Sequence, residues 1–148
     1  MKRLLLAGLF TLAAFAAACQ TVLYRDQATL EWDAVLGTTD GQPWLPGDVV
    51  SYEVYIYDHI MGVADAQNPA LLTLIGQTAV AAQLIVFPYR TVWAAGVRTK
   101  LVDGDGAVSY SAIAWSYIAL DADGVAGPFV YSPEGLPGKP GALRDSGT

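Results

Sequence analysis

The sequence contains a single cysteine and a single histidine, and these shortages exclude several kinds of site. Cys19 alone cannot form a disulfide within the chain, and Cys19 and His59 together are too few for a zinc site built from cysteine and histidine. No serine stands in a G-x-S-x-G turn, so no Ser-His-Asp arrangement can be identified. We interpret His59 as a surface-loop residue, and we predict no catalytic residue, no metal site and no cofactor.

Basic residues are also scarce. The chain has 8 Lys and Arg against 14 Asp and Glu, and its formal net charge is −6. A surface that binds nucleic acid needs clustered Lys and Arg to neutralise phosphates. The composition therefore argues against nucleic acid as a partner, and equally against electrostatic adhesion to anionic lipid.

An apolar run long enough to span a membrane is missing as well. A transmembrane helix needs roughly 20 apolar residues, whereas the uncharged apolar run near the N-terminus covers residues 4–14. This run follows Lys2 and Arg3 and precedes the small residues 16–18, which is the pattern of a secretory signal peptide. We predict that residues 1–18 are such a signal.

Cys19 directly follows Ala16-Ala17-Ala18, an arrangement that resembles the lipobox of bacterial lipoproteins, although the lipobox usually has Leu where Ala16 stands. The resemblance implies that the signal is cut before Cys19, that the thiol receives a diacylglycerol and that the new amine is acylated. Stable anchoring takes two or more lipid chains, and such a cysteine has them. Gln20 stands where Asp would imply retention in the inner membrane, so the resemblance implies the outer membrane. The alternative is an ordinary signal-peptidase cut, after Ala16 or Ala18, that leaves a free thiol.

The rest of the chain is dominated by short segments with the period-two pattern of strands. In residues 29–35, Leu30, Trp32 and Ala34 share one face. Further strands are predicted over 49–58, 70–78, 80–87, 91–102 and 107–120. The inward residues are predicted to be Tyr52, Val54, Ile56, Leu84, Val86, Trp93, Ala95, Val97 and Thr99. No helical period is convincing after the signal.

Glycine and proline mark the connections. Residues 37–48 and 59–69 are predicted loops. The sequence DGDG, residues 103–106, predicts a hairpin turn whose aspartates tolerate positive φ; a calcium loop is the weaker interpretation, because the remaining ligands are missing. From Asp121 onward glycine and proline dominate, so we predict an extended tail over 121–148, in which only residues 129–131 could dock locally.

A series of strands without helices predicts an all-β sandwich or small barrel. The segments LEWDAV, SYEVYIYD and FPYRTVWAAGVRTKLVDGDGAVSYS resemble a fibronectin type III domain. The resemblance implies one sandwich over residues 28–120, after a lipidated lead-in over 19–27, with Trp32 and Trp93 close together between the sheets. An immunoglobulin-like relative with another topology is the alternative.

Aromatic residues that the core does not need indicate where a partner could bind. Exposed Tyr and Trp are common anchors of interfaces and of sugar-binding platforms, so we predict Trp44, in the loop QPWLP, with Tyr55 and Tyr57, as contact residues. The main hypothesis is a non-catalytic binding or structural module in the bacterial envelope, held to the membrane by lipid on Cys19, with a protein or glycan partner. The alternatives are a carbohydrate-binding accessory domain and a hydrolase with dispersed carboxylates.

Overall fold

A computed structural model describes residues 21–58, 62–117, 129–136 and 138, and these ranges are mostly β-structure. This confirms the all-β prediction. No helix in these ranges is long and apolar enough to cross a membrane. The elements are β1 (Thr21–Leu23), β2 (Gln27–Glu31), β3 (Val49–Tyr57), α1 (Val63–Ala66), the 3₁₀ turn η1 (Pro69–Leu71), β4 (Thr73–Thr78), β5 (Ala82–Val86), β6 (Ala94–Val102), β7 (Val108–Tyr110), β8 (Ala114–Trp115) and β9 (Phe129–Tyr131).

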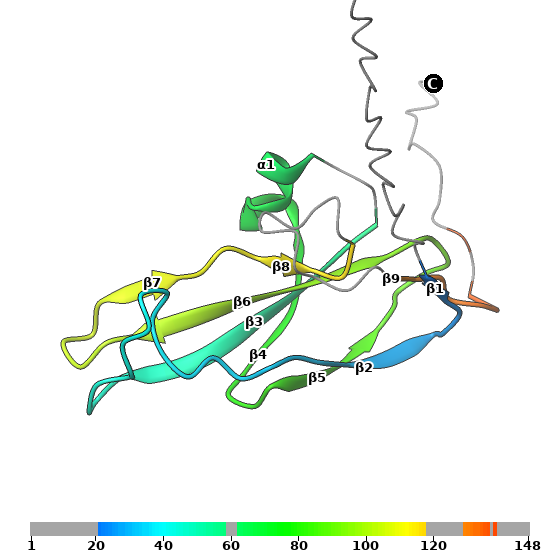
Figure 1. The fold of residues 1–148 in the computed structure, drawn as a ribbon. Coiled ribbons are helices and arrows are strands. Elements are labelled where there is room, and N and C mark those ends of the chain that lie inside the picture. Colours follow the sequence, from blue (N-terminus) through cyan, green and yellow to red (C-terminus); the bar gives the residue numbers. More distant parts are fainter. Residues whose placement is uncertain (1–20, 59–61, 118–128, 137, 139–148) are drawn as a thin grey trace, which may run out of the picture.

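The largest sheet has the order β4-β3-β6-β7, and β8 also pairs with β6 (Figure 1). Strands β3 and β6 are antiparallel along their full lengths, from Val49↔Val102 to Tyr57↔Ala94. The hairpin turn between β6 and β7 lies at the predicted DGDG. Its positive φ belongs to Gly106 (+86°) and not to an aspartate. The Asp103 side chain holds the turn by accepting hydrogen bonds on Oδ1 from the backbone N–H groups of Asp105 and Ala107, at 3.0 and 2.8 Å.

A smaller sheet, β2 paired antiparallel with β5, covers one face of the large sheet and encloses the main core. The core residues are Ala28, Leu30, Val54, Ile56, Ile85, Phe87, Trp93, Ala95 and Tyr131. The inward faces predicted for β3 and for the start of β6 are correct. The prediction for β5 is wrong by one residue: Leu84 and Val86 are 51% and 60% exposed, whereas Ile85 and Phe87 are buried.

The opposite face of the large sheet is also covered, by α1 and by the chain around β8 (Figure 1). Tyr55, Ala66, Ala94, Ile113 and Trp115 form this second, smaller core. The expectation of no helix is therefore wrong, because Val63–Ala66 is a short helix inside the predicted loop 59–69. A four-residue helix is only about one turn long, too short to show a period in the sequence.

The predicted single strand over 107–120 is interrupted. The chain pairs with β6 as β7, leaves the edge at residues 111–113, and pairs again as β8. The detour lets Ile113 enter the second core, where Gln67 holds its backbone: Gln67 Nε2 donates to Ile113 O (2.9 Å), and Ile113 N donates to Gln67 Oε1 (2.6 Å). The end of the predicted strand, 118–120, lies outside the described residues.

Part of the predicted tail belongs to the fold. Phe129–Tyr131 forms β9, which pairs in parallel with β1, and the backbones of Tyr131 and Trp93 exchange two hydrogen bonds of 2.8 and 2.9 Å. Val130 and Tyr131 are buried. The three consecutive apolar residues of β9 are enough to form one strand, although glycine and proline dominate the surrounding sequence. Residues 121–128, 137 and 139–148 of the predicted tail lie outside the described part.

Trp32 and Trp93 both contact the main core, but they have different ring partners. Trp93 is buried and packs against Phe87 and Tyr89, with ring centroids 6.2 and 5.0 Å away. Trp32 is only half-buried, and its ring meets Tyr52 edge-on at 5.3 Å. Trp32 therefore stands at the margin of the core, where it also reaches the surface.

Candidate functional site

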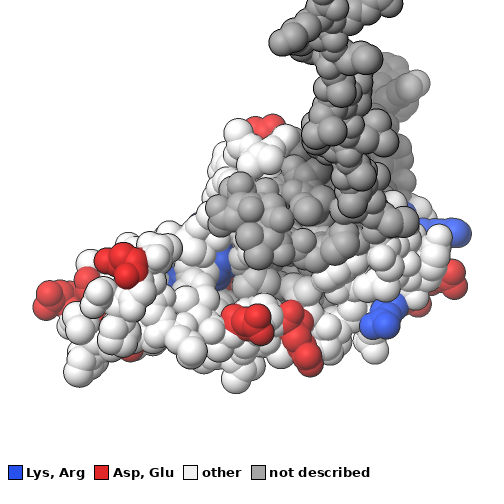
Figure 2. Space-filling model, in the orientation of Figure 1, with Lys and Arg blue, Asp and Glu red and all other residues white. Residues whose placement is uncertain are grey.

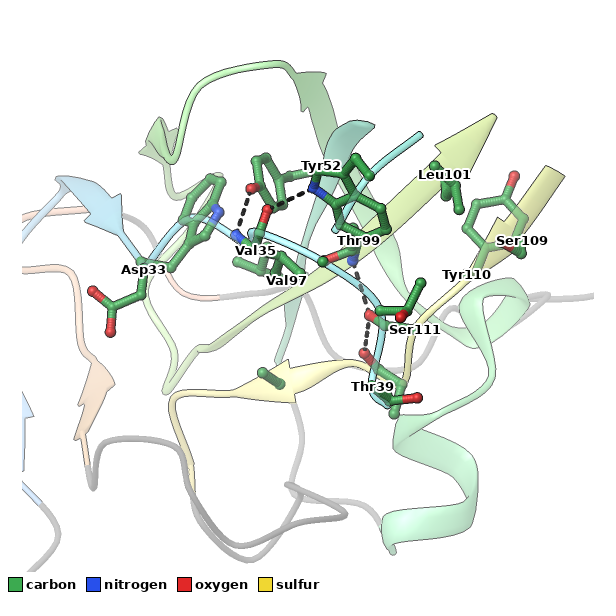
Figure 3. Close-up of a pocket in the computed structure, with 16 residues that line it drawn as sticks. Asp33, Val35, Thr39, Tyr52, Val97, Thr99, Leu101, Ser109, Tyr110 and Ser111 are labelled. Atoms are coloured by element: carbon green, nitrogen blue, oxygen red, sulfur yellow. Dashed lines mark hydrogen bonds between the residues drawn. The ribbon is translucent and has the colours of Figure 1, made fainter. Parts of the chain in front are cut away.

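A surface groove of about 630 Å³ lies between the chain that follows β2 and the wall formed by β6, β7 and β8 (Figure 3). We call it the aromatic groove, because four aromatic rings line it together with small and hydroxyl-bearing residues. The lining residues are Trp32, Asp33, Val35, Gly37, Thr38, Thr39, Trp44, Tyr52, Val97, Thr99, Leu101, Ser109, Tyr110, Ser111, Ala112 and Ala114.

Two aromatic side chains fix the loop that forms one wall of the groove. Val35 N donates a hydrogen bond to the Tyr52 hydroxyl (3.0 Å), and Trp44 Nε1 donates to Val35 O (3.1 Å). Both polar groups of Val35 are thus bonded to rings that line the groove, as the dashed lines in Figure 3 show. The loop is therefore held in place by side chains that also line the groove.

The opposite wall is fixed by hydrogen bonds of the Ser111 backbone and hydroxyl. Thr99 N donates to Ser111 Oγ (2.9 Å), Ser111 N donates to Thr99 O (3.0 Å), and Ser111 Oγ donates to Ala112 O (2.7 Å). Tyr110 packs its ring against the Arg98 guanidinium, with Cζ 3.9 Å from the ring centroid, an arrangement that attracts a cation to the ring face. This wall is therefore preformed, which lowers the entropy cost of binding.

The groove carries little charge. Asp33 is the only charged residue among the described residues that line it, and it lies at one end, with Leu101 and Tyr110 at the other (Figure 3). The charged side chains on the face drawn in Figure 2 stand in small separate groups on an otherwise uncharged surface. Such a lining suits an uncharged or cationic ligand with apolar faces.

Trp32 separates the aromatic groove from a smaller cavity of about 160 Å³. The two share Trp32, Val97 and Ala114, and the cavity extends between β2 and β8. Trp32 Nε1 is buried and has no hydrogen-bond partner in the described structure. An unpaired buried donor is uncommon, and a ligand or water at this position would satisfy it.

The predicted contact residues do not come together. Trp44 lines the aromatic groove. Tyr55 is only 3% exposed, so its ring does not meet the expectation of an exposed contact, and Tyr57 is half-buried against the second core. Cys19 and His59 lie outside the described residues.

Three groove aromatics were not predicted as contacts. Tyr52 and Trp32 were assigned to the core from their alternation, and they serve the core margin and the groove at once. Tyr110 was not singled out because its strand looked continuous with β8. The sequence held no signal for it, because its place in the groove depends on the break between β7 and β8.

A charged network on the outer face of the large sheet explains why Tyr55 is buried. Arg98 contacts Glu53 Oε2 through Nε (2.8 Å) and Nη2 (2.6 Å), and the Tyr55 hydroxyl donates to the same oxygen (2.5 Å). Burial alone would raise the pKa of Glu53, but the hydrogen bonds from Tyr55 and Arg98 and the Arg98 charge outweigh it and lower that pKa. Burial, with the bond to Glu53, raises the pKa of Tyr55 to about 12. The network lies apart from the groove walls, except through Tyr110, whose ring contacts Arg98.

Among the described residues, no three His, Cys, Asp or Glu side chains are placed to hold a metal ion together. Comparison with protein-family models, with curated proteins and with solved structures found no match for this chain.

Proposed function

We propose that this protein is a non-catalytic binding module whose ligand occupies the aromatic groove. The observation that carries the proposal is the groove itself. Its two walls, both fixed by hydrogen bonds, enclose about 630 Å³ and present the side chains of Trp32, Trp44 and Tyr110, whereas the buried Tyr52 supports the loop. Ligand sites commonly have volumes of about 300–1,000 Å³ and combine an apolar lining with a few placed polar groups.

An oligosaccharide is the ligand class that the lining favours. Sugars present apolar faces that stack on aromatic rings, and their hydroxyls match side chains that both donate and accept hydrogen bonds. The groove offers such hydroxyls from Thr39 and Ser109, and one carboxylate from Asp33. The hydroxyls of Thr38 and Ser111 already form hydrogen bonds within the fold.

The proposed fold is a fibronectin type III-like sandwich. The support is the strand order, in which β2 pairs with β5 in one sheet and β4-β3-β6-β7 form the other, with the main core between them. Pairing of β1 with β9 is an addition to that plan. A fold of this kind holds its ligand sites on loops and sheet edges, where the aromatic groove lies.

The proposed location is the bacterial envelope, with the chain anchored in the outer membrane by lipid on Cys19. The support is the N-terminal pattern together with the position of β1. Only Gln20 separates Cys19 from β1, and two residue steps span about 7 Å. The β1–β9 end of the domain would then lie against the membrane, with the β6–β7 hairpin at the far end (Figure 1).

Titration calorimetry tests the ligand. The purified chain is titrated with soluble cell-wall glycan fragments and with neutral oligosaccharides. Trp44→Ala and Tyr110→Ala should weaken binding at least tenfold, because stacking on an aromatic ring is lost. The control is Tyr24→Ala, which removes a ring that is 63% exposed outside the groove. No binding to any glycan rejects this ligand class, and unchanged affinity in Trp44→Ala rejects the groove.

The anchor has its own test. Cys19→Ser should release the protein from membranes washed with carbonate, and mass spectrometry of the native chain should show acyl chains on Cys19. Retention of the Ser variant, or an unmodified Cys19, rejects the anchor and leaves the groove proposal untouched.

A further inference from the structure

Strand β2 has a free edge. Its hydrogen bonds with β5 continue at both ends, from Trp32 N to Ala81 O and from Phe87 N to Asp26 O, both 3.1 Å. In an antiparallel pair, every second residue of a strand bonds its neighbour. Because Asp26 and Trp32 bond the β5 side, the backbone N–H and C=O groups of Gln27, Thr29 and Glu31 point away from β5. In the part of the chain that the structure describes, β5 is the sole strand neighbour of β2. The side chains of these three residues are exposed.

The free edge of β2 lacks the features that usually block strand addition. Natural edge strands are protected by proline, by lysine, by bulges or by a covering side chain. Residues 27–31 contain neither proline nor lysine, and their register with β5 is regular. The opposite edge of the small sheet differs, since Gln83 Nε2 donates to Leu84 O (3.1 Å), a carbonyl that points away from β2. Among the described residues, the two-stranded sheet is therefore open on the β2 side.

The charges along this edge are arranged for a second copy of the same strand. Arg25 precedes β2, whereas Glu31 ends it and Asp33 follows. An antiparallel copy centred on Thr29 places Arg25 opposite Asp33 of the second copy, and one centred on Ala28 places Arg25 opposite its Glu31. Each register is two-fold symmetric, so the charge pair forms twice. A parallel copy in register would instead set like charges beside each other, which is destabilising.

We propose that two copies of this chain associate by antiparallel pairing of their β2 edges, which joins the two small sheets into one four-stranded sheet, β5-β2-β2-β5. In the Thr29-centred register, Gln27 also faces Glu31 of the second copy, and Thr29 faces Thr29. Threonine pairs and opposite charges are among the favourable cross-strand neighbours. A closed two-fold arrangement of this kind stops at the dimer.

The test is sedimentation of the full chain, purified in density-matched detergent without any ligand, so its outcome is independent of the groove. The native chain should sediment as a dimer. Arg25→Glu should be monomeric, and so should the double variant Glu31→Lys/Asp33→Lys, because each places like charges opposite one another. A mixture of the two variants should recover a dimer that contains one copy of each. Mixing cannot repair a variant that is merely unfolded, so recovery is specific to the pairing.

A backbone substitution provides the second measurement. Thr29→Pro removes an outward N–H that does not bond β5, and proline is tolerated on such an edge. It should weaken the dimer at least tenfold while circular dichroism stays native, and Thr29→Val, which keeps the N–H, should leave the dimer intact. A monomeric native chain overturns the proposal. So does a dimer that persists in folded Thr29→Pro, or a failure of the mixed charge variants to associate.

Discussion

Gly96→Ala should destabilise the protein, because a packed tryptophan occupies the space of the missing side chain. A Cβ at position 96 would lie 2.8 Å from Trp115 Cε3 and 2.8 Å from Ile113 Cγ2. Neither neighbour moves easily. Trp115 Nε1 donates to Ala66 O (3.2 Å), and Gln67 holds both backbone groups of Ile113.

The expected size follows from two opposing effects. Extra methyl groups in a packed core typically cost about 1–3 kcal/mol, while replacing glycine restricts the unfolded chain and returns about 0.4–1 kcal/mol. The net loss should be about 1–2 kcal/mol, out of a total of about 5–15 kcal/mol for a domain of this kind. With a urea m-value of about 1–3 kcal/mol/M, the midpoint should fall by roughly 0.5–1 M. Tryptophan fluorescence reports the transition.

Gly76→Ala is the matched control. Gly76 is also a strand glycine, but the nearest atom to its added Cβ is Gln83 Oε1 at 3.8 Å, an ordinary contact. It should be neutral or slightly stabilising. Equal midpoints for the two variants would refute the account of Trp115 packing, as would a Gly96→Ala variant as stable as the native chain.

The other predictions concern the remaining parts of the fold. Tyr131→Ala should lower the free energy of unfolding by about 3–5 kcal/mol in denaturant melts, as for other buried aromatic residues, since Tyr131 is buried against Phe87. An unchanged free energy would show that β9 does not pack on the core. Glu53 has a folded-state pKa below its ordinary 4.5, so it contributes stability above that pH, and the contribution is lost as the pH falls through the folded value. Glu53→Gln should therefore flatten the acid side of the stability–pH curve, and an unchanged slope would contradict the shift. Gln67→Ala should lower the free energy of unfolding by about 1–3 kcal/mol, because it leaves two backbone groups of Ile113 unpaired. Gln67→Glu should lower it less, because it loses only the hydrogen bond to Ile113 O.

The sequence predicted the strands best where only one face could be apolar. Around Leu30 the polar neighbours Thr29 and Glu31 settle the choice of face, and the prediction for these residues is correct. In residues 84–87 every side chain is apolar, so alternation could not decide, and the face assigned was the wrong one. In the structure, the pairing of β5 with β2 determines that Ile85 and Phe87 face the core.

Other features depend on contacts between residues far apart in the sequence. The buried face of α1 exists because Trp115 and Ile113 cover it, some 50 residues further along the chain. Trp44 could be selected as a contact residue because its loop is rich in proline and glycine. Tyr110 could not be selected in this way, because its role depends on the break between β7 and β8. Tyr55 was predicted to be exposed, because nothing in the sequence indicates that Arg98 lies over its ring.

The pairing of β1 with β9 also sets the order in which the molecule can fold. Thr21 pairs with Phe129, a separation of 108 residues, whereas β3 and β4 are neighbours along the chain. Pairings across long separations form slowly, since the loop between them must first be closed. In a chain that emerges N-terminus first, Thr21–Leu23 waits for its partner strand while the two sheets assemble. The main core is complete only when Tyr131 packs into it. We therefore expect the pairing of β1 with β9 to be the last to form.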